Sequence, residues 1–184
     1  DYLKTLQKSD ASVYYFASSD KERVTKSIDK EEICAIGNHT IVTREQVQMY
    51  TKFYEITYDK TLSEKKAIAY AKERNALYVA AMQNGYQVTD EQVKAYVEEL
   101  KQNLDGIWTK EQKEKLLSGF ASEDDYWAFE QKVYRIDLPI QNYVRDKENE
   151  FNRKNESGQT WDEAFKTLKQ NLVDEQQYKD SSSY

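Results

Sequence analysis

Cys34 and His39 are the single cysteine and the single histidine of this 184-residue chain, and they are its first candidates for covalent chemistry. A cysteine thiolate activated by a histidine base is a common catalytic nucleophile. Both residues fall in one expected hairpin, but the sequence supplies no third group to orient the histidine. A packed hairpin cysteine is therefore the favoured interpretation, and the lone cysteine excludes an internal disulfide.

The other familiar reactive arrangements are missing from the sequence. It contains no glycine-rich phosphate loop, no Gly-x-Ser-x-Gly elbow and no His-Glu-x-x-His pair. A single histidine also leaves the multi-histidine zinc patterns unfilled. The acidic run Glu123, Asp124 and Asp125 follows Ser122, where carboxylates stabilise the positive end of a helix dipole without any metal. We therefore expect no catalytic residue, no metal and no cofactor.

Tyrosine is the residue type that this chain uses to excess. It has 15 Tyr and 3 Trp, and aromatic residues make up 13% of the sequence. Tyr50, Tyr54 and Tyr58 fall at i, i+4 and i+8, which aligns their rings on one face of a helix. Together with Trp108 and Trp127 they are the candidate peptide-binding residues, because adaptable amphipathic rings tolerate many partner sequences. The alternative for each of them is a position in the core.

The composition favours a mainly α-helical protein. Five Gly and one Pro are too few for a chain with many tight turns. A net charge of −6 without a basic tract argues against nucleic acid as a partner. No apolar run approaches the ~20 residues of a membrane span. The sequence begins at Asp1 without a methionine, so we expect any signal peptide or lipid anchor to lie outside it.

The elements that would position these residues begin with a small β-hairpin. Residues 1–32 form an N-terminal extension with one β-prone run, 13–17, that we expect as a short strand. Two further β-prone runs, 33–36 and 39–42, flank Gly37-Asn38, which suits a two-residue type II′ turn. A helical domain is expected to cover residues 33–178.

Helix starts are indicated by Ser or Thr, in most cases with Gln or Glu three residues later. This pattern predicts starts at Thr43, near 61–64, and at Thr89, Thr109, Ser122 and Thr160. Pro139 should bend the fifth helix near 135–139, because proline removes a backbone hydrogen bond and clashes with the preceding turn. The loop 152–158 should return the chain to a final helix. The tail, 179–184, is expected to be disordered.

The stretch from Ile33 to about Gln102 resembles the N-terminal domain of SurA-like chaperones, a family that includes PrsA-type foldases of the bacterial cell envelope. The similarity is most specific at 80–93, Ala-Ala-Met-Gln-Asn-Gly-Tyr-Gln-Val-Thr-Asp-Glu-Gln-Val. This looks like the family's junction of helix, Gly, x, x, Val, Thr or Ser, Asp, Glu, x, Val. Physically it is a glycine C-cap, a short link and a capped helix start. Gly37-Asn38 reverses the family's usual Asn-Gly turn.

The resemblance implies a helical domain with an N-terminal hairpin and a returning C-terminal helix. The family's parvulin-type isomerase domain is absent, since only 152–158 occupies its usual place and His39 alone cannot supply its histidine pair. The implied function is a non-enzymatic, extracytoplasmic chaperone module, membrane-anchored through a lipoprotein-type segment outside this sequence, that binds unfolded or extended polypeptide. The alternative is a scaffolding module of the cell envelope with one defined protein partner. An enzyme formed by 1–32 and the hairpin is a third hypothesis.

Overall fold

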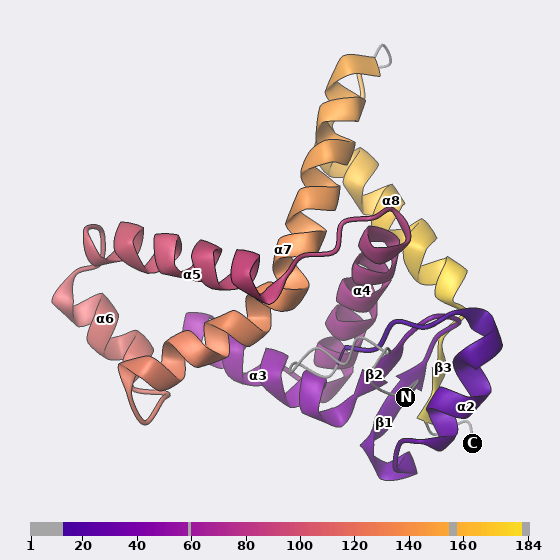
Figure 1. Ribbon diagram of the computed structural model, residues 1–184, viewed down its shortest axis with the longest axis horizontal. Coiled ribbons are helices and arrows are strands. Elements are labelled where there is room, and N and C mark those ends of the chain that lie inside the picture. The colour runs from indigo at the N-terminus through magenta and orange to yellow at the C-terminus, as the bar shows by residue number, and fades with distance from the viewer. Residues whose placement is uncertain (1–12, 59, 155–157, 182–184) are drawn as a thin grey trace.

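The computed structural model of the chain describes residues 13–58, 60–154 and 158–181 (Figure 1). It confirms the mainly helical fold with a small antiparallel sheet. The helices are α2 (Lys21–Lys26), α3 (Arg44–Tyr58), α4 (Glu64–Gln83), α5 (Asp90–Asp105), α6 (Lys110–Leu117), α7 (Glu123–Lys154) and α8 (Trp161–Gln176), with 3-10 turns η1 (Ser18–Asp20) and η2 (Lys30–Glu32). The strands are β1 (Ile33–Ile36), β2 (Ile41–Thr43) and β3 (Lys179–Asp180), in the order β2-β1-β3.

The tail 179–184 was expected to be disordered, but its first two residues form strand β3. Lys179 and Asp180 pair antiparallel with Ile36 and Ala35 of β1. The Lys72 ammonium of α4 holds the Asp180 carboxylate at 2.6 Å, which fixes this end of the chain against the body of the protein. Residues 182–184 of the expected tail lie outside the described residues.

The expected strand at 13–17 does not form. These residues are irregular, although the Phe16 amide donates to the carbonyl of His39 at 3.0 Å. Val13 and Phe16 are buried. The β-prone side chains of this run therefore serve the core directly, without joining a strand ladder.

The hairpin turn also differs from the expected type II′ geometry. Ile36 pairs with Ile41, so the connection includes all of 37–40. Gly37 is not among the glycines with positive φ, which a first position in a type II′ turn requires. The end of α8 holds the turn instead, because the backbone carbonyl of Gln176 accepts from the Asn38 amide at 2.8 Å.

Three of the predicted helix starts are confirmed as complete capping boxes. At Thr89, Thr109 and Thr160, the threonine hydroxyl accepts from the third residue's amide, and that residue's side chain accepts from the threonine amide. Ser122 accepts from the Asp125 amide at 3.1 Å before α7. Gly85, at φ 82°, ends α4 in the left-handed region that favours glycine.

Two further helices begin where predicted but lack the predicted capping box. The Thr43 hydroxyl accepts from the Gln46 amide at 3.2 Å, but the Gln46 side chain turns into the protein and does not complete the box. The N-cap of α4 is Ser63, not Thr61, and its hydroxyl accepts from the Lys66 amide at 3.3 Å.

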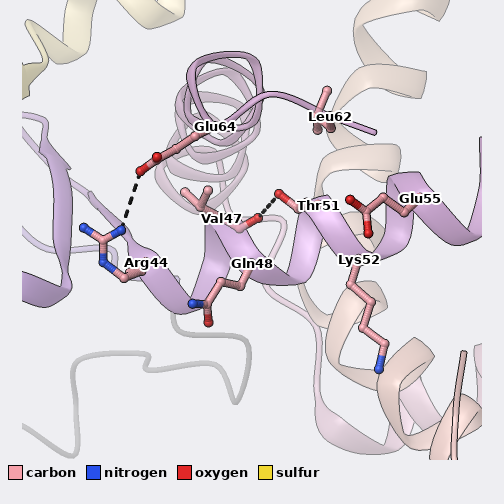
Figure 2. Close-up of a pocket in the computed structure, with 8 residues that line it drawn as sticks. All are labelled: Arg44, Val47, Gln48, Thr51, Lys52, Glu55, Leu62 and Glu64. Atoms are coloured by element: carbon pink, nitrogen blue, oxygen red, sulfur yellow. Dashed lines mark hydrogen bonds and ion pairs between the residues drawn. The ribbon is translucent and has the colours of Figure 1, made fainter. Parts of the chain in front are cut away.

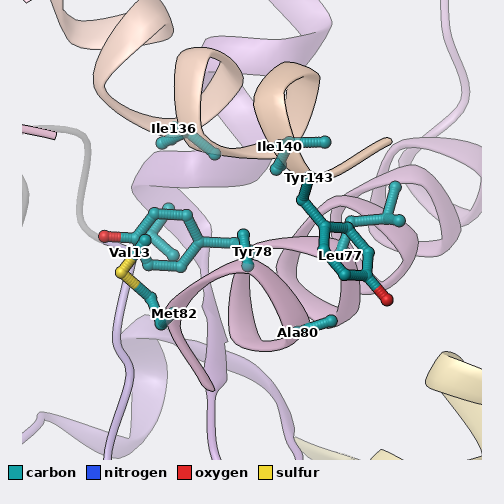
Figure 3. Close-up of a cluster of buried hydrophobic side chains, with 9 residues drawn as sticks. Val13, Leu77, Tyr78, Ala80, Met82, Ile136, Ile140 and Tyr143 are labelled. Carbon is teal, nitrogen blue, oxygen red and sulfur yellow. The ribbon is translucent and has the colours of Figure 1, made fainter. Parts of the chain in front are cut away.

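Helix α4 forms the centre of the main core. Leu77, Tyr78 and Met82 of α4 pack against Ile136 and Ile140 of α7 (Figure 3). Alanines on α4 let the neighbouring helices approach closely, and α8 covers another side of the same cluster with Phe165, Leu168 and Leu172. Each large apolar side chain that is fully buried here stabilises the fold by about 1.5–3 kcal/mol.

Helices α5, α6 and the part of α7 before Pro139 form an arm that extends away from the sheet (Figure 1). Helix α7 continues through Pro139 but changes direction in its middle, as predicted for an internal proline. The arm has its own apolar cluster, which includes Val93, Val97 and Leu138. We call the remainder of the described structure the body.

Candidate functional site

The cysteine and histidine do not form a catalytic arrangement. Cys34 lies at the irregularity between Ile33 and Ala35 in the β1–β2 register and is buried. Burial raises the pKa of its thiol, whereas a nucleophilic cysteine needs a lowered pKa. The Nδ1 atom of His39 lies 3.0 Å from the carbonyl of Phe16, so the histidine ties the N-terminal segment to the hairpin.

A buried amide pair fixes helix α3 against α4. The Asn75 side chain donates to the Gln46 side chain at 3.1 Å and to the backbone carbonyl of Ile41 at 3.2 Å, and Gln46 donates back to Asn75. Both side chains are fully buried. Because a buried amide that loses its partner is costly, this pair defines how the tyrosine-bearing helix is placed.

The tyrosines of α3 divide between the core and the surface. Tyr50 is 5% exposed and packs in the cluster beneath the sheet, which favours the core alternative for this residue. Tyr54 is half-buried, and Tyr58 is 58% exposed. The spacing aligns the three tyrosines along α3, but only the rings toward the C-terminal end of the helix are accessible.

A third accessible ring comes from α4. Tyr70 is 45% exposed and meets Tyr50 edge-on, with ring centroids 5.0 Å apart. Tyr54 and Tyr58 contact each other at 4.9 Å. Burial raises the pKa of Tyr70. We call Tyr54, Tyr58 and Tyr70 the tyrosine surface.

A partly buried ion pair between α4 and α7 lies next to Tyr50 and Tyr70. Arg74 of α4 donates to the carboxylate of Asp137, next to the bend of α7. Burial opposes the charge of Arg74, but Asp137 and the hydroxyls of Tyr50 and Tyr70 raise its pKa, so the guanidinium stays charged. The pair joins α4 to α7 directly behind the exposed rings.

The two candidate tryptophans lie elsewhere, in the arm. Trp127 is buried and Trp108 is half-buried, and their rings stack at 6.1 Å. Both belong to the aromatic cluster between α5, α6 and α7. Trp127 is therefore a core residue of the arm, which favours the core alternative over peptide binding.

Sequence reasoning missed Tyr70, Arg74 and Asp137. Tyr70 follows the exposed, charged first turn of α4, Glu64 to Lys66, by about one turn, which is a signal that could have identified it. The Arg74–Asp137 pair joins residues far apart in the sequence, and no local spacing predicts it.

A shallow cavity of about 380 Å³ lies along α3 and the start of α4 (Figure 2). Basic and acidic side chains both line it: Arg44, Lys52, Glu55 and Glu64. Arg44 pairs with Glu64 at 3.5 Å. Val47 and Leu62 provide its apolar contacts. This mixture supplies no reactive group.

Within the described ranges, no three His, Cys, Asp or Glu side chains are grouped so as to hold a metal ion. Each described helix is too short or too polar to cross a bilayer. Comparison of the chain with protein-family models, curated proteins and solved structures gave no match.

Proposed function

We propose that this protein binds unfolded or extended polypeptide segments through the tyrosine surface, without catalysing a reaction on them. The observation that carries this proposal is the exposure of Tyr58 on α3 and of Tyr70 on α4, two helices that pack against each other. Isolated exposed apolar residues are ordinary, but adjacent exposed rings held on rigid helices are typical of a binding surface.

The chemistry of tyrosine suits such clients. A tyrosine ring covers apolar side chains, and its hydroxyl exchanges hydrogen bonds with a passing peptide backbone. The ring has few rotatable bonds, so little conformational entropy is lost on binding. The Arg74–Asp137 pair and the Gln46–Asn75 pair hold the supporting helices in place.

The resemblance to SurA-like chaperones supports the same function. The hairpin, the junction at 80–93 and the returning helix α8 all occur in the order that the resemblance implies. On that basis we propose an extracytoplasmic chaperone module of the cell envelope, lacking the isomerase domain of the family. A scaffolding role with one defined protein partner is the competing hypothesis that the experiment below addresses.

The test removes the accessible rings and leaves Tyr50 in place. The triple variant Tyr54→Ser, Tyr58→Ser, Tyr70→Ser is compared with Ile107→Ser, which changes an isolated residue that is 72% exposed on the arm. Binding is measured by fluorescence anisotropy with a labelled protein kept unfolded by reduction and carboxymethylation. Circular dichroism confirms that each variant is folded.

We expect the triple variant to bind the unfolded client at least several-fold more weakly than the wild type, and Ile107→Ser to bind it unchanged. Equal binding by the folded triple variant would remove the tyrosine surface as the site. If the wild type binds no unfolded client but retains one saturable envelope protein, the scaffolding role replaces the chaperone role.

A further inference from the structure

The arm rests on the C-terminal half of α3 through apolar side chains. Phe129 of α7 stacks on Phe53 of α3, with ring centroids 6.4 Å apart. A Cβ atom on Gly119 would lie 2.7 Å from Cδ1 of Ile56, so the backbone of the arm lies directly against this side chain. We call this contact the latch: Phe53 and Ile56 on α3, and Gly119 and Phe129 on the arm.

The latch covers a face of α3 next to the tyrosine surface. Successive residues of an α-helix are about 100° apart around its axis, so Phe53 and Tyr54 lie on neighbouring faces. Phe53 and Ile56 are half-buried, whereas Tyr58 is exposed. Moving the arm away from α3 would therefore add apolar surface beside rings that are already accessible.

The connections of the arm allow it to move as a unit. It joins the body through the link 84–89 and through the bend of α7. Pro139 has no amide hydrogen to donate within the helix, and helices bend most readily where that hydrogen bond is missing. Within the arm, Phe120 contacts both Tyr126 and Phe129 at 5.3 Å, and these contacts do not depend on α3.

We propose that the arm is an autoinhibitory lid, which covers the Phe53 and Ile56 face of α3 until an extended client segment with apolar side chains takes its place. This inference rests on the proposed function and adds a means of regulating the same site. A client that binds only the open state has its apparent affinity reduced by the fraction of molecules that are open. Removing one aromatic pair shifts such an equilibrium about two- to tenfold, so a weakened latch should raise the client affinity by about that factor.

The first test variant is Phe129→Ala, which opens the latch from the arm and leaves α3 intact. It removes the ring that stacks on Phe53. Its control is Phe151→Ala, the same change at another half-buried ring of α7, whose printed partner is Trp161 and not α3. The two variants therefore lose similar side chains, but only one of them loosens the latch.

The second test variant is Gly119→Leu, which forces a side chain between the arm and Ile56. Its control is Gly106→Leu, where the nearest contact of a Cβ atom would be a backbone oxygen at 3.8 Å. Circular dichroism confirms that each variant is folded. Because the two test variants open the latch by opposite changes in volume, one of them still tests the inference if the other does not fold.

Two measurements are made on each protein. Client affinity is measured by fluorescence anisotropy with the same unfolded, carboxymethylated protein as above. The position of the arm is measured by double electron–electron resonance between nitroxide labels at Gln48→Cys on α3 and Lys110→Cys on α6, both exposed, in a Cys34→Ala background. The second measurement needs no client, so it reports opening of the arm independently of the proposed function.

We expect Phe129→Ala and Gly119→Leu to bind the client about two- to tenfold more tightly than the wild type and to populate a longer label distance, with both controls unchanged. Saturating client should lengthen the distance in the wild type too. Unchanged distances or affinities in the folded latch variants, or a wild-type distance that the client leaves unaltered, would overturn the inference. In that case weaker binding by the tyrosine triple variant would leave the proposed function standing, whereas no client binding by any of the proteins would remove both.

Discussion

Gly37 is required by a close approach of two chain segments, not by a turn conformation. A Cβ atom at this position would lie 2.9 Å from Cε1 of Tyr178 and 3.0 Å from Oε1 of Gln176. Overpacking of this kind costs about 1–3 kcal/mol, so Gly37→Ala should lower the free energy of unfolding by that amount. Urea denaturation measures it.

The matched control for this change is Gly106→Ala. Its nearest contact would be a backbone oxygen at 3.8 Å, so the free energy of unfolding should change by less than about 0.5 kcal/mol. If Gly37→Ala were as stable as Gly106→Ala, the contact between the hairpin turn and the C-terminal segment would not be as tight as described.

Glu130 is a buried carboxyl group whose charge destabilises the arm. Burial raises its pKa, the Tyr126 hydroxyl bonded to it lowers the pKa, and Asp137 raises it further. The folded pKa thus exceeds the ordinary glutamate value of 4.5. The native state then binds more protons than the unfolded state, so this contribution to stability is present below about pH 4.5 and is lost as the pH rises through the folded pKa.

Glu130→Gln keeps the size of the side chain and its ability to accept from Tyr126, but it removes the charge. As the pH rises from about 4.5 to 7, we expect the free energy of unfolding to fall less for the variant than for the wild type. Each unit of pKa difference corresponds to about 1.4 kcal/mol. Thermal and urea unfolding across this range measure the effect, and parallel pH profiles for the two proteins would show that Glu130 is not destabilised by burial.

At the scale of elements, helix α8 stabilises the body through one apolar face. Leu168 packs against the main core cluster, whereas Lys166 is exposed on the same helix. Leu168→Ala should lower the free energy of unfolding by about 2 kcal/mol, at the low end for leucine truncations because the side chain is half-buried. Lys166→Ala should be nearly neutral. Similar midpoints for the two variants in urea would show that α8 is not held by this face.

The sequence predicted elements well where a local signal specifies them. Three threonine capping boxes and the proline bend depend on neighbouring residues, and each was found where the spacing placed it. Gln46 shows the limit, because its spacing fits a capping box but its side chain bonds to Asn75 on another helix. The strand β3 was missed for the same reason, since Lys179 and Asp180 have no strand signal and pair only because α8 delivers them to β1.

The candidate site was predictable only in part. The i, i+4, i+8 spacing identified a tyrosine stripe on α3, but it could not show that Tyr50 is covered while Tyr58 is exposed. Exposure depends on which helices pack over each turn, and Tyr70 reaches the same surface from a different helix. The sequence could likewise not show that Trp127 is buried, because a buried and an accessible tryptophan have the same local pattern.

At the scale of the whole molecule, the arm and the body have separate apolar clusters. They meet at the bend of α7, where Leu138 belongs to the arm's cluster and Ile136 to the main core, and side chains of the arm also contact α3. Phe129 of the arm stacks on Phe53 at 6.4 Å, and Ile56 lies so close to Gly119 that a Cβ there would be 2.7 Å from its Cδ1. Because each cluster buries its own apolar surface, each can open with its own free energy.

Trp127→Ala tests whether the arm opens independently. Removing a buried tryptophan costs about 3–5 kcal/mol, and the loss should fall on the arm because its contacts are with Trp108 and Tyr126. Native-state hydrogen exchange should therefore show faster exchange of α5 and α6 amides, with those in the buried half of α4 nearly unchanged. Trp161→Ala, which removes a ring stacked on Phe165 of α8, should leave exchange in the arm unchanged.

If Trp127→Ala accelerates exchange in α4 and α8 as much as in α5, the two clusters open together as one cooperative unit. The tyrosine surface would then depend on the arm for its stability. If α5 and α6 alone respond, α3 and α4 can hold the exposed rings in place while the arm opens and closes beside them.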